Sequence, residues 1–511
     1  MPFGDEKTRR QEKVIGTAFC QLHRGSEKTA MIRGREHWTY NRLLADVERL
    51  AAGLAAAGVR AGDRVALHIP TGPEIALAYL ACFRLGAIAA PLNLRIKTPE
   101  LEDMLRRLKP SLYIGDAAHY PLVKPIGTDV LRADSRFVIG DPPDAIARRW
   151  TSLASDTQAS GAQVSLGNLD PTAPAILLAT SGTTGKPKLV AHSQATLREL
   201  AIRVGDLDMR AHDRIALFVP MVHGSGFFTF IGGLLKGATL VMLDAANPAS
   251  ILDGIQAERC SWMVSLPTRY LPIMEEQRRH PRDISSLRFC LSGGDVCLPG
   301  QQEAFPSVFN TPLHSFWASS EGCGALTYGL KPGPVSRLSK GTEIRLVDPA
   351  GNTVTQGEPG EMQLRGPSIA LGYWQGPGVF DAFPGGWYAS GDIMREDESG
   401  HFWFVSRSKD LIIRAGSNIS AVEVEDVLGS HPAVKDAGVV GVPDPVLGQR
   451  VIAFIQLKHH ANEADQLDEI QRSISARLAD YKLPEQIFAV KEIPRNHLGK
   501  MDRAALAKLA Q

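Results

Sequence analysis

The stretch Thr180-Ser181-Gly182-Thr183-Thr184-Gly185-Lys186-Pro187-Lys188 decides how this sequence is interpreted. It directly follows the apolar run 176–179. Glycines permit a tight turn whose backbone N–H groups converge on an anion, hydroxyl groups add donors, and lysines add positive charge. Such a loop suits a polyphosphate, so a nucleoside triphosphate is the first ligand to consider.

This stretch is not a Walker A loop, which has a glycine five residues before Gly-Lys and Ser or Thr after it. Thr180 and Pro187 stand at those two places. For a lone loop rich in Gly, Ser and Thr, a solvated surface turn is the ordinary alternative. The choice between the two depends on the rest of the chain.

Length and composition indicate a multidomain globular protein. A chain of 511 residues is too long for one compact core, so we expect two or more domains. The hydrophobic fraction of 44% and the charged fraction of 22% are typical of soluble globular proteins. The formal charge is only +1, from 56 basic and 55 acidic side chains, which favours neither nucleic acid nor an anionic membrane as partner.

The 6 cysteines show no C-x-x-C pair and no His/Cys ligand spacing. We therefore expect buried reduced thiols rather than disulfides or a zinc site. The first ten residues lack the apolar core of a signal peptide, and no apolar run approaches the length of a membrane span. The sequence thus predicts a cytoplasmic protein without integral membrane contact.

Helices and strands alternate in the first part of the chain. Thr39 is a predicted N-cap for an amphipathic helix that Gly58 ends, and a strand at 64–69 precedes a helix at 73–85. Continuous apolar strands with helices between them predict parallel sheets covered on both faces. Further strand candidates lie at 214–218, 239–243, 262–265 and 287–291.

The pattern changes after Lys340. Short strands with Gly turns at 343–347, 361–365 and 402–405 predict a small antiparallel sheet or barrel. After Ser406 we expect a separate C-terminal domain, joined near 406–410, with a helix at 465–479. Its predicted strands lie at 411–414, 437–440 and 451–457.

Seen together, the motifs of this chain resemble those of the adenylate-forming superfamily of acyl- and aryl-CoA synthetases, luciferases and peptide-synthetase adenylation domains. The likeness is greatest to a bacterial acyl- or aryl-CoA ligase. Leu189, Ala179, Ala318 and Gln449 depart from the family's usual residues, which leaves the subfamily open. The motifs that carry the resemblance, in chain order, are 180–188 (TSGTTGKPK), 220–226 (PMVHGSG), 292–294 (SGG), 317–321 (WASSE), 387–392 (WYASGD), 407–410 (RSKD), 414–419 (RAGSNI) and 496–503 (NHLGKMDR).

The resemblance implies an α/β fold. Residues 1–406 would form a large N-terminal adenylation domain of helix-covered sheets, with a small distorted β-barrel at about 340–406. Residues 407–511 would form a mobile α+β domain that turns about a hinge at Lys409, with Gly416 lining the CoA tunnel. The implied activity is that of an ATP-dependent acid–thiol ligase that uses ATP, Mg²⁺ and coenzyme A in fatty or aromatic acid metabolism.

Asp392 and Glu321 carry the implied nucleotide chemistry. Asp392 is an acceptor for both ribose hydroxyls in the resemblance, with Arg407 beside it; on its own it could equally cap a turn. Glu321, with Thr184, would hold Mg²⁺, which needs few protein carboxylates; a lone Glu is more often solvated. The implied ATP-binding residues are Thr180, Ser181, Gly182, Thr183, Thr184, Gly185, Lys186, Lys188, Gly293, Gly294, Trp317, Ser320, Glu321, Asp392, Arg407 and Lys500.

Lys500, His223, Glu321 and Thr184 are the implied catalytic residues. An ammonium group at position 500 can bridge the acid's carboxylate and the α-phosphate, although most lysines in such a place are simply exposed. His223 would help to set the approach of the carboxylate, whereas a lone His in an apolar setting is more often a core residue.

The implied acyl pocket has an aromatic character that suits an apolar, flat or medium-sized carboxylic acid. Asp295 would repel a second carboxylate if it faces the pocket, and it could equally point outward and bond to backbone. The pocket residues are His223, Phe227, Phe228, Ser265, Gly293, Asp295, Phe316 and Trp317.

Three rival functions stay open at this point. A stand-alone adenylation enzyme would load a carrier protein instead of CoA, and we expect no fused carrier domain after Lys500. A luciferase-type reaction uses the same adenylate. A nucleotide-binding module without catalysis would bind ATP but release no pyrophosphate. The sequence also leaves open whether the protein forms a homodimer.

Overall fold

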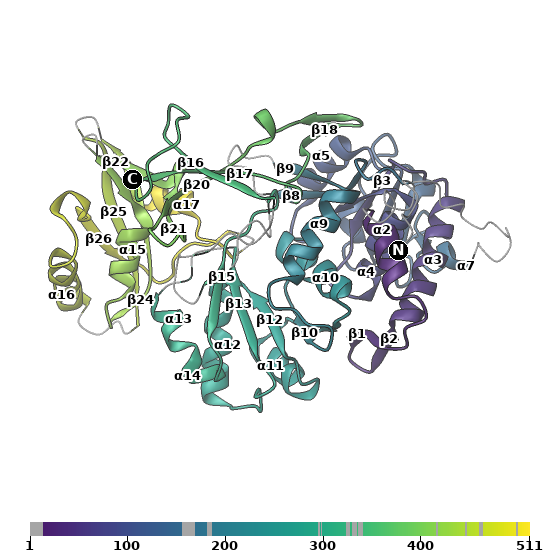
Figure 1. Ribbon diagram of the computed structural model, residues 1–511, viewed down its shortest axis with the longest axis horizontal. Helices are drawn as coiled ribbons and strands as arrows, with labels where there is room; N and C mark the ends of the chain where they lie inside the picture. The colour runs from purple at the N-terminus through teal and green to yellow at the C-terminus, as the bar shows by residue number, and fades with distance from the viewer. Residues whose placement is uncertain are drawn as a thin grey trace, which may run out of the picture.

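Two large sheets form the body of the protein, with the N-terminal part on the right of Figure 1 and the C-terminal part on the left. The structure is a computed structural model. It describes residues 14–155, 169–180, 187–294, 297, 299–322, 328–329, 335, 341–414, 417–444, 447–458, 463–496 and 499–510.

The first sheet has nine strands and is parallel over most of its width. Its three edge strands on one side, β9, β18 and β19, run antiparallel to their neighbours. In spatial order the strands are β19 (Val379–Asp381), β18 (Gly372–Gly376), β9 (Lys188–Ser193), β8 (Pro174–Thr180), β4 (Ile88–Pro91), β3 (Arg64–His68), β5 (Leu112–Asp116), β6 (Arg136–Ile139) and β7 (Arg148–Arg149).

The second sheet has eight strands, and only its two end pairs, β1–β2 and β14–β15, are antiparallel. The spatial order is β15 (Tyr328–Gly329), β14 (Leu313–Phe316), β13 (Phe289–Gly293), β12 (Trp262–Ser265), β10 (Arg214–Leu217), β11 (Thr239–Met242), β1 (Thr29–Arg33) and β2 (Glu36–Thr39).

Helices fill the space between the two sheets and cover their outer faces. The largest core cluster joins residues of both sheets to α4 (Pro73–Leu85), α9 (Gln194–Gly205) and α10 (Gly224–Lys236). This arrangement confirms the predicted helix-covered parallel sheets. The remaining helices of this part are α2 (Ile15–Leu22), α3 (Tyr40–Ala56), α5 (Thr98–Leu108), α6 (Tyr120–Val123), α7 (Ser152–Ser155), α11 (Pro248–Ala257), α12 (Pro267–Arg279), α13 (Pro299–Ala304) and α14 (Pro306–Phe309).

Capping and turn residues in the sequence predicted several helix boundaries correctly. Thr39 caps α3 by accepting a hydrogen bond from the Arg42 amide, and Gly58 follows the helix with a left-handed φ of 94°. Helix α4 spans the predicted residues, begins with Pro73 and ends before the left-handed Gly86. Strand β13 lies two residues later than predicted, at Phe289–Gly293.

The β-rich region after Lys340 divides between two sheets. Strands β16 (Glu343–Val347), β17 (Pro359–Arg365), β20 (Tyr388–Glu396) and β21 (Phe402–Arg407) form a four-stranded antiparallel sheet with its own apolar cluster. Strands β18 and β19, from the same region, extend the nine-stranded sheet instead. The predicted sheet or barrel is therefore an open antiparallel sheet in the described residues.

The C-terminal part has a separate five-stranded sheet and its own core. Helix α16 ends at Ser475 rather than at 479 as predicted. A turn follows, in which the amides of Arg477 and Leu478 both donate to the Ile474 carbonyl, and a 3₁₀ turn comes next at Asp480–Lys482. The strands are β22 (Leu411–Arg414), β23 (Ser417–Ser420), β24 (Val434–Asp444), β25 (Gly448–Leu457) and β26 (Gln486–Ala489), and the helices are α15 (Ala421–Gly429), α16 (Glu463–Ser475) and α17 (Arg503–Leu509).

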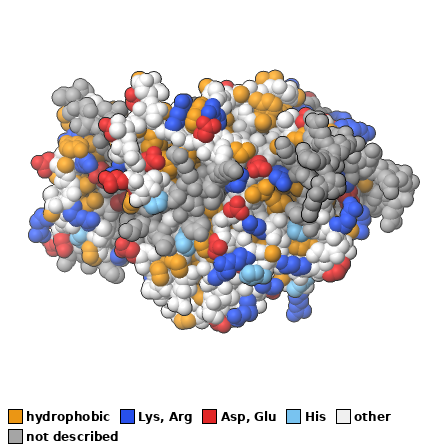
Figure 2. Space-filling model, in the orientation of Figure 1, with side chains coloured by type: hydrophobic (Ala, Val, Ile, Leu, Met, Phe, Trp, Pro, Cys, Tyr) orange, Lys and Arg blue, Asp and Glu red, His pale blue; other side chains and the backbone are white. Residues whose placement is uncertain are grey.

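The surface and the cysteines agree with a reduced globular chain. Figure 2 shows positive and negative side chains mixed over the coloured part of one face, without a large region of one sign. The cysteines that the structure describes, Cys20, Cys82, Cys260, Cys290 and Cys297, are free thiols. None of the described helices combines the length and the apolar character that crossing a lipid bilayer requires.

A buried ion pair connects the last helix to the C-terminal sheet. Glu425 of α15 is 6% exposed and pairs with Arg503, the first residue of α17. Both side chains also bond to the backbone of Val439 in β24, at 2.7 Å from its N–H to Glu425 and at 2.6 Å from Arg503 to its carbonyl. Burial raises the pKa of Glu425, and the charge of Arg503 opposes that rise.

We predict that Arg503→Met lowers the free energy of unfolding by about 3–5 kcal/mol at pH 8, because it leaves a buried carboxylate unpaired. The loss should be smaller at pH 5, where a carboxyl with a raised pKa is more readily protonated. Denaturant titration of the variant and of Arg503→Met/Glu425→Gln checks this. Equal losses in the single and double variants would show that the charge is not the cause.

Candidate functional site

A cavity of about 660 Å³ opens where strands of both large sheets end. Ligand sites in parallel sheets lie beyond the carboxyl ends of the strands, and the cavity wall takes residues from the ends of β8, β13 and β14. The structure brings many of the expected residues to this wall, although they lie far apart in sequence. They are Thr180, Lys188, His223, Phe228, Gly293, Gly294, Phe316, Ser320, Glu321, Asp392, Arg407 and Lys500.

Part of the expected site lies outside the described residues. This concerns Ser181, Gly182, Thr183, Thr184, Gly185 and Lys186 of the phosphate loop, together with Asp295 and Gly416. The two ends of the loop are described: Thr180 ends β8 and Lys188 begins its antiparallel neighbour β9. The Lys188 ammonium lies over the ring of Tyr373, 4.3 Å from its centroid, so positive charge does stand at the cavity wall.

Asp392 of β20 is the most constrained charged group of the site. It is 3% exposed, and its Oδ2 accepts a hydrogen bond from the Trp317 indole at 2.6 Å. Its Oδ1 forms an ion pair with Nε of Arg407 at 2.7 Å but accepts no hydrogen bond from the described residues. Burial raises the pKa of Asp392, and Arg407, Trp317 and Lys500 lower it.

Trp317 does not stand in the cavity wall, although the sequence predicts it among both the ATP-binding and the acyl-pocket residues. Phe316 and Ala318 line the cavity, while Trp317 between them packs into the apolar cluster of the antiparallel sheet. Side chains of extended backbone alternate between opposite faces, so the neighbours of an inward residue point away. Trp317 instead holds Asp392, and Phe316 supplies the aromatic surface.

Glu321 is a buried carboxylate at the cavity wall, 7% exposed. The hydroxyl groups of Tyr373 and Tyr388 donate to its two oxygens at 3.1 and 3.2 Å. Among the described residues no cation pairs with it, and no cluster of three or more His, Cys, Asp or Glu side chains forms a metal site. The sequence reasoning missed both tyrosines, which come from β18 and β20.

A side-chain contact joins this segment to β9, the strand that follows the phosphate loop in the sequence. His192 of β9 is fully buried, and its Nε2 lies 2.8 Å from the carbonyl oxygen of Ser320. Burial lowers the pKa of His192 to about 4, against the opposing effect of that hydrogen bond, so the imidazole is neutral and Nε2 donates. His223 lines the cavity from the N-cap position of α10.

Lys500 is presented on a tight turn. The Asn496 amide donates to the Lys500 carbonyl at 2.8 Å, the Asn496 side chain accepts from the Lys500 amide at 3.2 Å, and Gly499 takes a left-handed φ of 81°. Arg495 anchors the turn by bonding to the Gly499 carbonyl at 3.2 Å and to Asp436 of β24. The turn thereby carries Lys500 from the C-terminal sheet to the cavity wall.

Two other expected pocket residues do not reach the wall. In α10 the lining residues are Gly224, Ser225, Phe228 and Thr229, whereas Phe227 points to the opposite side and packs edge-on against Tyr79. In β12 the lining residues are Trp262 and Val264, so alternation turns Ser265 to the other face. The side-chain periodicity of a helix or strand fixes which residues share a face. It would have predicted the positions of Phe227 and Ser265 if the faces of α10 and β12 that turn toward the cavity had been known.

Two arginines in the wall were also missed. Arg95 follows β4, and Arg269 lies in the first turn of α12, where it donates to the Ala245 carbonyl at 3.3 Å. Burial, and then the positive charge of Arg95, lower the pKa of Arg269. Single arginines in loops and helix starts carry no pattern that sequence reasoning could have used.

Comparison with known proteins gives two family matches that cover most of the chain. Residues 20–374 match the model described as AMP-binding enzyme, and residues 423–500 match the model described as AMP-binding enzyme C-terminal domain.

Named relatives and a solved structure agree with these matches. The chain is 31% identical over 482 residues to a feruloyl-CoA synthase of an Amycolatopsis species, covering 93% of this chain and 94% of that protein. It is also 31% identical to a medium-chain fatty-acid–CoA ligase of Escherichia coli K12, over 92% of this chain and 85% of that protein. The crystal structure of an anthranilate CoA ligase in complex with anthranoyl-AMP superposes with a TM-score of 0.87 at 26% identity, covering 97% of this chain and 98% of that one.

The neutral state of His192 predicts a pH dependence of stability. Because its pKa is near 4 in the folded chain and about 6.5 when unfolded, the unfolded state binds the extra proton between these values. Stability should therefore fall as the pH drops from 6.5 to 4, by at most about 1.4 kcal/mol per pH unit for one such group. His192→Gln keeps a donor and should reduce this slope, measured by thermal unfolding across pH. The exposed His37→Gln serves as control, and identical slopes in all three proteins would contradict the assignment.

Proposed function

This chain belongs to the AMP-binding enzyme family, and we propose that it is a carboxylate–CoA ligase that works through an acyl-AMP. One observation carries the proposal. Lys500, Asp392, Glu321 and His223, which the sequence spreads over nearly three hundred residues, line one cavity. The named relatives join acids to CoA, and the anthranilate CoA ligase structure holds an acyl-AMP, which supports the same intermediate here.

The polar end of the cavity suits an adenosine nucleotide. Asp392 Oδ1 is a buried acceptor without a hydrogen bond from the described residues, so the ribose hydroxyls can donate to it. Arg407 balances the carboxylate charge. Phe316 offers a flat surface to the base, and Gly293 and Gly294 bring backbone close to it. The phosphate loop that begins at Thr180 would hold the triphosphate.

In the first step a carboxylate oxygen of the acid attacks the α-phosphorus of ATP. The bond from that phosphorus to the bridging oxygen breaks, and pyrophosphate leaves with the bonding electrons. The Lys500 ammonium would lie between the two anions and stabilise the charge that builds on the α-phosphate. Glu321, a buried carboxylate held by two tyrosines, fits a hard cation, and Mg²⁺ bound there would neutralise phosphate charge.

In the second step the thiol sulfur of CoA attacks the acyl carbonyl carbon, and AMP leaves with the electrons of the broken anhydride bond. We propose that residues 407–511 rotate as a unit, which withdraws Lys500 and admits the thiol. The 3₁₀ turn Ser408–Asp410 contains the proposed hinge residue Lys409, between β21 and β22. Arg95 and Arg269 place positive charge on the wall, which suits an acceptor with phosphates.

Two other functions predict different products. A carrier-loading enzyme would transfer the acyl group to a phosphopantetheine protein and not to CoA. A nucleotide-binding module would bind ATP without acid-dependent release of pyrophosphate.

The decisive experiment measures pyrophosphate release with a panel of aromatic and fatty acids, then adds CoA or a holo-carrier protein and identifies the thioester. No release with any acid would refute the ligase.

Lys500→Ala should lower the rate of acyl-AMP formation at least about a hundredfold, because it removes charge stabilisation from the transition state. Conversion of supplied acyl-AMP to acyl-CoA should stay close to the original rate.

Lys409→Pro should slow the conversion of acyl-AMP to acyl-CoA more than the formation of acyl-AMP, because it hinders rotation at the hinge. Each half-reaction is measured separately. Equal loss of both halves in either variant would refute the role given to that residue.

Trp317→Phe should raise the KM for ATP about tenfold, since a buried hydrogen bond to a charged group contributes roughly 1.5–3 kcal/mol. The KM for the acid should change little, because Trp317 packs behind the wall. Phe316→Ala should also raise the KM for ATP, through loss of the aromatic surface. Steady-state kinetics with each substrate varied separately checks both, and a changed acid KM in Trp317→Phe would contradict its placement.

A further inference from the structure

The cavity continues beyond its polar end into an apolar part between the eight-stranded sheet and the helices α9 and α10. Val264 and Leu291 of the sheet line one side, and Val204 and Phe228 of the helices line the other. Trp262, the first residue of β12, lies at the far end of this part. The polar end is at the opposite, carboxyl end of the same strands.

Trp262 is held rigidly in that place. Its side chain is 1% exposed, and its indole Nε1 donates to the Leu207 carbonyl at 3.0 Å. The ring stacks on Phe289 of the adjacent strand, with 6.3 Å between the centroids and 17° between the planes. Leu207 also lines the cavity, so these two side chains together close its far end.

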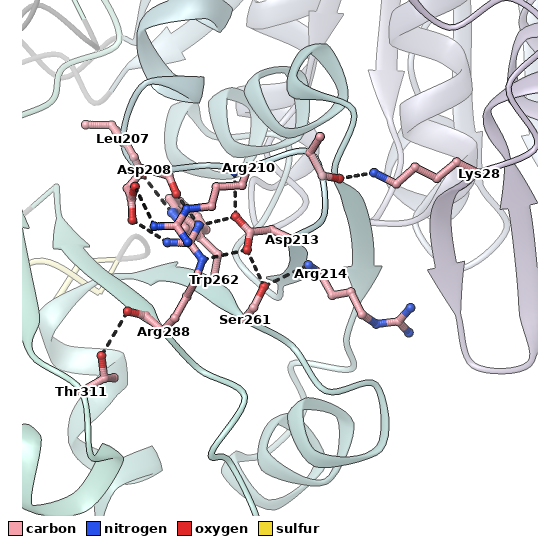
Figure 3. A network of polar contacts seen from close by, with 11 residues as sticks. Lys28, Leu207, Asp208, Arg210, Asp213, Arg214, Ser261, Trp262, Arg288 and Thr311 are labelled. Carbon is pink, nitrogen blue, oxygen red and sulfur yellow. Dashed lines mark hydrogen bonds and ion pairs between the residues drawn. The ribbon is translucent and has the colours of Figure 1, made fainter.

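The turn that carries Leu207 is fixed by charged groups. Asp208 has a left-handed φ of 55°, a conformation that Asp tolerates better than most residues. Figure 3 shows Arg288 between Asp208 and Asp213, beside Trp262. Arg288 donates to the carboxylate and the carbonyl of Asp208 and to both oxygens of Asp213.

Asp213 is itself buried, with 0% of the residue exposed. Burial would raise its pKa, but bonds from Arg288, from the Ser261 hydroxyl at 2.7 Å and from the Arg210 amide at 2.7 Å lower it, so it stays charged. A ligand would therefore not easily displace the network of Arg288, Asp208 and Asp213. Rotation of Trp262 away from the cavity would break its bond to Leu207 and leave a buried carbonyl unsatisfied.

The far end has few polar groups to offer a ligand among the described residues that line it. Thr229 places a hydroxyl there, which donates to the Ser225 carbonyl at 2.7 Å within α10 and therefore keeps only its capacity to accept. The Trp262 N–H is used by Leu207. A carboxylate on a ligand's tail needs donors, and it would lose its bonds to water there without replacement.

The strand register gives the length of this apolar part. Ser265 pairs with Ser292, next to Gly293 at the polar end, and Trp262 pairs with Phe289. Ser265 and Trp262 lie three residues apart along β12, a distance of roughly 10 Å. An extended chain of about nine bonds spans the same distance.

We propose that Trp262, seated on Leu207, is the specificity-determining residue that ends the acyl pocket and limits the acid to an unsubstituted apolar tail of medium length. This inference rests on the ligase function proposed above. An acid would place its carboxylate toward Lys500 and extend its tail along β12 until it meets the indole.

The test uses straight-chain acids from butanoic to hexadecanoic acid, with kcat/KM for pyrophosphate release as the readout. In the original protein kcat/KM should rise about fourfold per added methylene, as expected for burial of a CH₂ group, and then fall where the tail meets Trp262. In Trp262→Ala the fall should move to acids several methylenes longer. A medium-chain acid with a second carboxylate at the end of its tail should be a poor substrate of the original protein.

Trp403→Ala is the matched control, because that indole bonds to Asp397 in the antiparallel sheet and does not line the cavity. If Trp262→Ala does not fold, Leu207→Ala opens the same end. An unchanged length profile in a folded variant refutes the inference and leaves the ligase intact. If no acid releases pyrophosphate, the proposed ligase function is refuted. Calorimetric binding of the same acids then shows whether Trp262→Ala shifts the preferred chain length. No shift refutes the inference about Trp262 as well.

Discussion

The burial of Asp392 is the constraint on which the polar end of the site depends. Asp392 is 3% exposed, and burial raises its pKa, while Arg407, Trp317 and Lys500 oppose that rise. These three residues come from the end of β21, the segment after β14 and a turn near the C-terminus. One buried charge therefore couples both parts of the chain, and withdrawal of Lys500 would change its charge balance.

The same strands serve both ends of the cavity. The carboxyl end of β13 supplies Gly293 at the polar end, while the face of the sheet supplies Val264 and Trp262 to the apolar end. Charged groups are concentrated where strand ends leave room for a nucleotide, and the interior is apolar because it lies between packed layers. In the function proposed here, the acid would place its carboxylate at the polar end and its tail against the rigid wall at the apolar end.

Sequence reasoning was reliable wherever the signal is local. The helix cap at Thr39, the extent of α4 between Pro73 and Gly86, and the apolar strands follow from the chemistry of neighbouring residues, and the structure has them nearly as predicted. It was less reliable at the end of α16, where apolar spacing continues through Leu478 although the helix has ended at Ser475. Leu478 is buried although it lies outside the helix, so the spacing of apolar residues alone cannot place that end.

By itself, the sequence determined the family, the helix-covered parallel sheets and the motif residues that meet in the cavity, because spacing and residue type carry that information. Only the tertiary structure decided which side of each element faces the cavity: Phe316 and not Trp317, Phe228 and not Phe227, Val264 and not Ser265. A strand or helix fixes which side chains share a face, but its inward face is chosen by partners distant in sequence. Arg288 and Leu207 meet for that same reason, and their contact sets the far wall of the pocket.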